Sequence, residues 1–193
     1  MPRTIVVLQG HPHSDPAHLC HALARAYAEG AREAGHAVRE FDIGAMEFPF
    51  LRDPKDFLTP APPAIKEVQD AVLGADHLLI VYPLWLGTMP ALVKGFFEHF
   101  ARAEFAIAQS DKGWPRKMLK GRSARVVVTM GMPATAYRVF FGAHGVKGFE
   151  SSILGMAGIE PVHETLIGGV GAENEKTRQG WLDSIREHGR RGD

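Results

Sequence analysis

Four histidines crowd the segment that follows the first apolar run of the chain. They are His11, His13, His18 and His21. Because imidazole is a frequent zinc ligand, a metal site is the first chemistry to weigh. Apart from Cys20, no cysteine or carboxylate constellation accompanies them at zinc-ligand spacing, so we expect no metal. His11 leaves the end of a buried strand and should face a ligand crevice, whereas His18 and His21 are expected on the exposed side of a helix.

The same segment offers a place for a phosphate. Residues 9–16 form a loop that ends at an expected helix N-terminus, where free backbone N–H groups and the positive end of the helix dipole can hold an anion. No GxxxxGK[ST] or GxGxxG pattern occurs there, which disfavours ATP and a Rossmann-type dinucleotide. Ser14 and Asp15 can either contact that ligand or cap the helix, and both interpretations stay open.

A second loop, residues 82–90, is apolar and aromatic although it should lie at a strand end, where loops are normally polar. Trp85 and Leu86 would line a pocket, and the backbone amides would bond the polar edge of a heteroaromatic ring. The alternative is a loop that packs onto its own core.

A third loop runs from residue 129 to residue 145. Its glycines let the backbone approach a ligand closely. Tyr137 and His144 form a polar pair among aromatic residues, and such a pair can donate protons to a substrate or stabilise negative charge on it. The alternative is a tyrosine bonded to backbone and a solvated histidine.

The elements that must position these loops alternate between strand and helix. Strands are expected at 5–8, 38–43, 76–82, 124–129 and 162–167, and helices at 17–34, 64–73, 92–100, 148–157 and 173–188. Residues 107–121 are expected to form a loop.

This alternation predicts an α/β fold in which helices cover both faces of a parallel sheet. Five strands are too few for an eight-stranded barrel, so we expect a flavodoxin-like three-layer sandwich with a five-stranded parallel sheet in the order 2-1-3-4-5. Ligands of such sheets lie beyond the carboxyl ends of the strands, between strands 1 and 3. The three loops described above meet at that edge.

Length and composition set limits on function. The 193 residues fit one domain, 1–193. Positive and negative side chains number 22 each, which argues against nucleic acid and anionic membranes as partners. One cysteine, no signal peptide and no apolar run near the ~20 residues of a membrane span indicate a cytoplasmic protein.

Several motifs together resemble a known family. They are GHP after the first strand, YPLWLGTMPALVKGFFEHF across the third strand and its helix, TMGMP after the fourth strand, and FGAHG followed by ILGMAGI. The chain is similar to the flavodoxin-like NAD(P)H:quinone oxidoreductase family, which includes bacterial ancillary oxidoreductases of potassium efflux systems. The resemblance implies a non-covalent flavin, FMN or FAD, that takes hydride from NAD(P)H and passes two electrons to a quinone in a ping-pong mechanism.

The resemblance also implies site residues. Flavin phosphate would be held by His11, Ser14, Ala17, His18 and Leu19. The isoalloxazine ring would be bordered by Pro83, Leu84, Trp85 and Leu86 on one side and by Thr129, Met130, Gly131 and Met132 on the other. Tyr137 and His144 match the tyrosine and histidine of the family's quinone pocket.

Other functions stay open. A flavodoxin-type electron carrier is an alternative, although such carriers tend to be acidic and this chain is neutral. A regulatory accessory subunit of a membrane transporter is another. A homodimer is expected, because the family builds its quinone pocket across two subunits and because an aromatic stripe, Phe96, Phe97 and Phe100, follows the third strand. The stripe can equally belong to the core.

Overall fold

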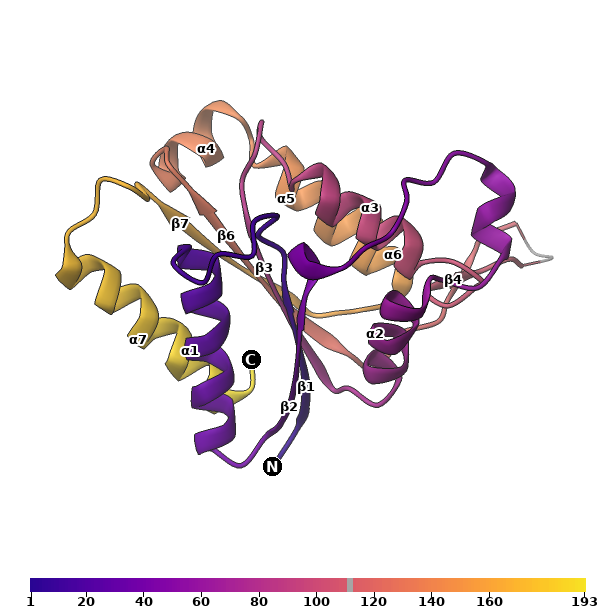
Figure 1. The fold of residues 1–193 in the computed structure, drawn as a ribbon, viewed down its shortest axis with the longest axis horizontal. Helices are drawn as coiled ribbons and strands as arrows, with labels where there is room; N and C mark the ends of the chain where they lie inside the picture. The colour runs from indigo at the N-terminus through magenta and orange to yellow at the C-terminus, as the bar shows by residue number, and fades with distance from the viewer. Residues whose placement is uncertain (111–112) are drawn as a thin grey trace.

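A five-stranded parallel sheet forms the centre of the molecule in a computed structural model that describes residues 1–110 and 113–193 (Figure 1). Its strands are β1 (Thr4–Gln9), β2 (Ala37–Asp42), β3 (His77–Pro83), β6 (Ser123–Met130) and β7 (Val162–Gly168). They lie in the order β2-β1-β3-β6-β7, and every neighbouring pair is parallel. Counted among these five strands, this is the expected order 2-1-3-4-5.

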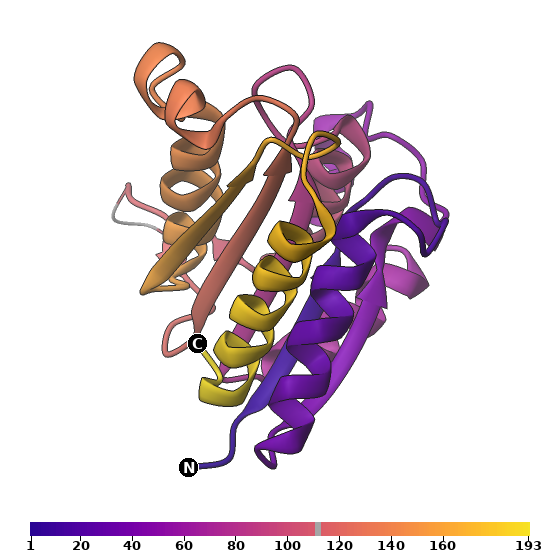
Figure 2. The same cartoon turned by 90° about the vertical axis from the view of Figure 1, so that its left-hand side faces the viewer.

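Helices cover both faces of the sheet because successive strand residues point to opposite sides. Ile5 and Val7 of β1 pack with α1 (Leu19–Glu33) and α7 (Glu175–Arg191), which lie side by side in Figure 2. Val6 and Leu8 belong to the core on the other face, which holds α2 (Pro63–Leu73) and α3 (Ala91–Phe100). None of the helices in the described part of the chain combines the length and hydropathy that a bilayer span requires.

Two stretches expected to be loops contain secondary structure. Within 107–121, β4 (Ile107–Ala108) and β5 (Arg116–Lys117) form an antiparallel pair, and residues 111–112 of that stretch lie outside the described residues. Strands of two residues are too short to show a periodic pattern. Within 129–145 lies α4 (Ala134–Phe140), at the top of Figure 1.

The helix expected at 148–157 begins earlier, at His144. It comprises α5 (His144–Gly148), the π-helix η3 (Phe149–Leu154) and α6 (Gly155–Ala157). Gly142 and Ala143 take positive φ values of 58° and 51°, which end α4 and allow a new helix to start. Gly142, one of the glycines of the expected loop, therefore marks a break between two helices.

The connection between β2 and α2 is irregular, as its prolines predict. It holds two short 3₁₀ helices, η1 (Ile43–Ala45) and η2 (Pro54–Leu58). Asp42 and Asp53 cap them by accepting hydrogen bonds from Gly44 N–H and Lys55 N–H, each at 2.9 Å.

The aromatic stripe on α3 belongs to the core. Phe96, Phe97 and Phe100 are 0%, 3% and 3% exposed and pack against one another. Burying each ring contributes about 1.5–3 kcal/mol to stability. These side chains therefore give no support to a dimer interface, and the core interpretation of the stripe is the one that the structure shows.

Stability is expected to fall below about pH 6.5 because of His77. Its side chain is fully buried, and Nδ1 pairs with Ser123 Oγ at 2.7 Å. Burial, and then the nearby charges of Arg3 and Arg125, lower the pKa of His77 from 6.5 to about 3. Between these values the unfolded chain binds a proton that the folded chain does not, so stability present above pH 6.5 is lost as the pH falls toward 3. Urea denaturation across this range should show a weaker pH dependence in His77→Phe, and an unchanged dependence would contradict the prediction.

Candidate functional site

The carboxyl ends of β1, β3 and β6 enclose a hollow of about 200 Å³. Its lining comprises His11, His18, Leu19, Cys20, Pro83, Leu84, Trp85, Thr129, Met130, Gly131 and Val170. These residues come from the loop before α1, the start of α1, the loop after β3, the end of β6 and the segment after β7. The three loops singled out in the sequence therefore meet at one place, the edge of the sheet beside the topological switch.

Four of the residues expected to bind the flavin do not line this hollow. Ser14 and Ala17 are exposed on the loop before α1. Leu86 projects fully into solvent from the tip of a turn, and Met132 packs against the core on the α3 face of the sheet. The sequence placed them correctly on the loops but did not show which side chains point inward.

The N-terminus of α1 fits a bound anion. His18 occupies the N-cap position, but no side chain of the described residues caps the helix there, and the first turn carries no acidic residue. The first N–H groups of a helix have no carbonyl partner one turn before them. His21 N–H bonds His18 O at 3.1 Å, which leaves the N–H groups of Leu19 and Cys20 for a phosphate. Asp15 accepts a hydrogen bond from Ala17 N–H at 2.9 Å and so braces the loop before the helix.

The histidines gather around that helix end. The rings of His11 and His18 stack with centroids 3.8 Å apart, and His21 contacts Gln9 Nε2 at 2.8 Å. Burial, and then three neighbouring histidines, lower the pKa of His11. His18 and His21 are half-buried in this cluster rather than placed on the outer face of α1, which corrects the sequence-based expectation. Helical periodicity missed this because His18 precedes the first helical residue.

The loop after β3 makes a tight turn that carries Trp85 and Leu86. Trp85 and Thr88 exchange backbone hydrogen bonds of 2.9 and 3.1 Å, and Leu86 and Gly87 take positive φ values of 49° and 83°. The amides of Trp85 and Thr88 are therefore engaged within the turn. Leu84 N–H donates to Thr129 O at 2.7 Å, which ties the turn to the end of β6. The indole of Trp85 is 49% exposed and leaves a flat apolar surface beside the hollow.

Tyr137 lies on α4 and supports this turn. Its side chain is 1% exposed, and its hydroxyl donates to Gly87 O at 2.9 Å. Burial raises the pKa of Tyr137. The single hydroxyl proton is thus directed at backbone, which is the arrangement that the sequence left open as the alternative to a free proton donor.

His144 lies near the same turn. It is exposed and lines a neighbouring hollow of about 440 Å³ together with Thr88 and Phe149. Neither Tyr137 nor His144 lines the hollow at the strand ends. The structure therefore brings both residues to the turn that carries Trp85, but Tyr137 bonds its backbone whereas His144 lines the neighbouring hollow.

Tyr137→Phe is expected to cost about 0.5–1.5 kcal/mol of stability, the net contribution of one hydrogen bond of this kind. It removes the donor to Gly87 O without opening a cavity. Urea denaturation measures the change, and Tyr27→Phe serves as a comparison because its hydroxyl bonds Asp193 O at 3.3 Å, far from the turn. If Tyr137→Phe unfolds at the same urea concentration as the wild type while Tyr27→Phe is destabilised, the assigned support of the turn is wrong.

Two residues of the lining were not among the predicted site residues. Cys20 is buried with Sγ 3.2 Å from Thr129 Oγ1, and burial raises the pKa of its thiol to about 11. Val170 follows β7. A signal for Val170 was present, since Gly168 and Gly169 mark the carboxyl end of the fifth strand, which opens onto the same edge of the sheet.

Taken together, the sheet order and the hollow at the switch point define a doubly wound α/β protein of the flavodoxin type. Residues 3–189 match the model of a family described as having a flavodoxin-like fold, and the chain belongs to that family.

Individual relatives are more distant. An uncharacterised NAD(P)H oxidoreductase of Haemophilus influenzae is 26% identical over 123 residues, which are 63% of this chain and 60% of that protein. FMN-dependent NADH:quinone oxidoreductase 8 of Burkholderia lata is 23% identical over 94% of this chain and 92% of its own. The structure of an NAD(P)H:quinone oxidoreductase from Methanothermobacter marburgensis superimposes with a TM-score of 0.78 at 22% identity, with both chains fully covered. The chain spans about three fifths of the length of the first curated relatives that it matches.

Proposed function

We propose that this protein is a flavin-dependent oxidoreductase that transfers two electrons from NAD(P)H to quinones or similar small electrophiles. The observation that carries the proposal is the hollow at the ends of β1, β3 and β6, where an uncapped helix N-terminus meets an apolar wall. Relatives named as FMN-dependent NADH:quinone oxidoreductase and NAD(P)H:quinone oxidoreductase support the choice of reaction.

The residues around the hollow fit a flavin. The N–H groups at the start of α1 would hold the phosphate, with His11 and His18 beside it. Pro83, Leu84 and the exposed indole of Trp85 offer the flat apolar contact that a ring system needs, and the end of β6 forms the opposite wall. FMN or FAD held there would supply the capacity to accept a hydride and release two electrons.

One hollow has to serve both substrates. The described part of the chain forms one doubly wound sheet, whose ligands bind at one edge, so the nicotinamide and the acceptor would occupy the same face in turn. Alternate occupancy corresponds to ping-pong kinetics. His144 lines the neighbouring hollow, so it would donate a proton only to an acceptor that reaches past the turn after β3. Tyr137 would hold that turn in place through Gly87 O.

The test is the absorbance spectrum of the purified protein, with and without added FMN or FAD, followed by steady-state quinone reduction. We expect visible flavin bands, quinone-dependent oxidation of NAD(P)H and parallel double-reciprocal plots. Leu84→Asp places a charge in the apolar wall and should weaken flavin binding about tenfold or more, since an unpaired polar group costs about 1–3 kcal/mol on burial. Leu73→Asp is the matched control, because Leu73 is 56% exposed at the end of α2. Failure of both flavins to bind would overturn the proposal.

We further propose that the protein acts as a homodimer through an apolar surface beside the hollow. This surface consists of Trp85, Leu86, Val139, Phe140 and Phe141, which are 49–106% exposed. The hydrogen bond from Tyr137 to Gly87 places α4 against the turn, so these side chains belong to adjoining segments. An exposed apolar patch of this kind marks an interaction surface.

Phe140→Asp is expected to convert the dimer to a monomer in sedimentation. Leu58→Asp, a change at another exposed apolar residue, on η2, should leave the dimer intact. A wild-type protein that sediments as a monomer and retains full activity would contradict the dimer.

A further inference from the structure

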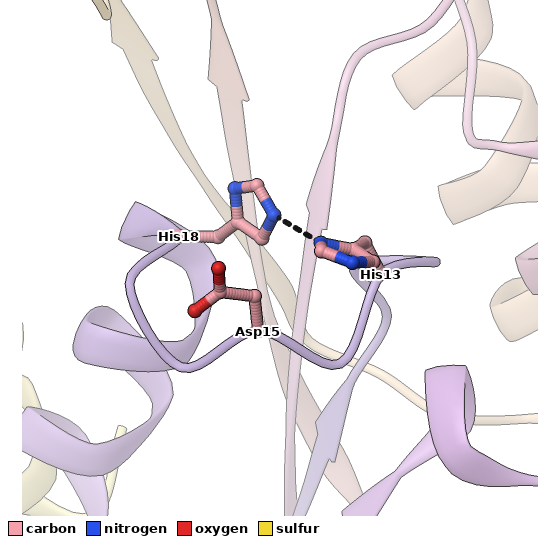
Figure 3. Close-up of side chains that lie close together, drawn as sticks. All are labelled: His13, Asp15 and His18. Atoms are coloured by element: carbon pink, nitrogen blue, oxygen red, sulfur yellow. Dashed lines mark hydrogen bonds between the residues drawn. The ribbon is translucent and has the colours of Figure 1, made fainter.

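The outer side of the loop before α1 brings together three potential metal ligands, of which only His18 also lines the proposed flavin site. Figure 3 shows the rings of His13 and His18 facing each other, with the Asp15 carboxylate close to His18. His13 Nδ1 and His18 Nε2 are 2.8 Å apart, and the ligand atoms of all three residues lie within 4.8 Å of one another. Sequence spacing argued against a metal because no carboxylate accompanied the histidines, but the fold supplies one in Asp15.

The donor set suits a divalent transition metal. Imidazole nitrogen and carboxylate oxygen bind Zn²⁺ at about 2.0–2.2 Å, and ligand atoms of a tetrahedral site therefore lie about 3.3 Å apart. One separation in the cluster is 2.8 Å and none exceeds 4.8 Å, so small side-chain rotations would bring the three ligand atoms to this spacing. Three protein ligands leave a fourth position for water.

Neighbouring groups hold the two histidines in place. His13 O lies 3.1 Å from His21 Nε2 and 3.0 Å from His11 Nδ1, so two further imidazoles brace the backbone of the loop. The His18 ring stacks on His11. Such support around a ligand is what orients metal-binding histidines.

The negative charge of Asp15 favours a cation over an anion between these three side chains. A carboxylate with an oxygen within 4.8 Å of a nitrogen of each histidine repels a phosphate and attracts a metal ion. Asp15 does not line the hollow at the strand ends, whereas His18 does, so the two places share only His18. Cys20 is not part of the cluster because its thiol faces Thr129.

We propose that His13, Asp15 and His18 form a binding site for a divalent transition metal of the Zn²⁺ class. The proposal does not rest on the proposed oxidoreductase activity, since its readout is metal binding.

The experiment is calorimetric titration of Zn²⁺ into the untagged full-length protein, repeated with Co²⁺ while its visible absorbance is recorded. We expect one metal ion per chain. His13→Ala and His18→Ala should each weaken binding by about tenfold or more, the scale seen when even supporting groups of metal sites are removed. Asp15→Asn should also weaken metal binding.

His163→Ala is the matched control, because His163 is exposed on β7 and should leave the affinity unchanged. Circular dichroism of each variant verifies folding. The proposal is overturned if binding is not saturable or if the histidine variants bind the metal as the wild type does. It is also overturned if Asp15→Asn binds with unchanged affinity, because Asp15 would then not be a ligand.

Discussion

Gly145→Ala is expected to lower the rate of quinone reduction about a hundredfold, the loss that a misplacement of about 1 Å can cause at a reacting centre. Gly145 lies in the first turn of α5, where the helix touches the turn after β3. A Cβ added there would overlap Gly87 O and lie 2.8 Å from Thr88 Cα. Both partners are backbone atoms, so no side-chain rotation relieves the contact.

The turn is the part that has to move. Its other attachments are the hydrogen bonds from Tyr137 to Gly87 O and from Leu84 N–H to Thr129 O. A displaced Gly87 weakens the first of these and shifts Trp85, which lines the hollow. The fold itself should persist, since alanine favours a helix over glycine by about 1 kcal/mol.

Gly148→Ala is the matched control in the same helix, because a Cβ at that position meets nothing within 4 Å. It should leave turnover unchanged and raise the midpoint of thermal unfolding slightly. Steady-state quinone reduction and flavin content are measured for both variants. Equal turnover in the two variants would show that the position of the turn does not control the reaction.

The sheet and its ligand edge could be predicted from sequence because buried parallel strands leave a strong local signal. Runs such as Ile5–Leu8 and Leu78–Val81 are continuous and apolar, and each ends in a breaker. The order of the strands then follows from general rules of doubly wound sheets, and with it the edge at which the loops meet.

Side-chain direction on the loops could not be predicted in the same way. Leu86 and Trp85 are neighbours in the chain, yet Leu86 projects into solvent and Trp85 lines the hollow. The positive φ angles of Leu86 and Gly87 turn the chain at this point, and such angles leave no periodic pattern in the sequence. Asp15 joins His13 and His18 only through the path of the loop, which no fixed spacing encodes. The aromatic stripe of α3 had two interpretations, and only tertiary packing decided between them.

Gly189→Ala is expected to destabilise the fold by about 1–3 kcal/mol, the cost of overpacking a closely packed interface. Gly189 of α7 lies directly against the backbone of α1: an added Cβ would overlap Tyr27 O and lie 3.0 Å from Ala31 N. Gly30 makes the reciprocal approach from α1, where a Cβ would overlap Arg186 O. The two helices therefore pack at a distance that only glycine permits.

The same contact connects stability to the hollow, because α1 begins at Leu19 and carries Cys20, both of which line it. Gly189→Ala should therefore also weaken flavin binding, since separating α1 from α7 displaces the helix end that would hold the phosphate. Gly180→Ala is the control: it lies on the same helix, its Cβ would meet nothing within 4 Å, and it should stabilise the protein by up to about 1 kcal/mol. Urea denaturation and flavin titration of the two variants measure both effects. If Gly189→Ala is as stable as Gly180→Ala, α1 and α7 can separate without cost. The packing of these two helices would then not fix the position of the α1 N-terminus at the hollow.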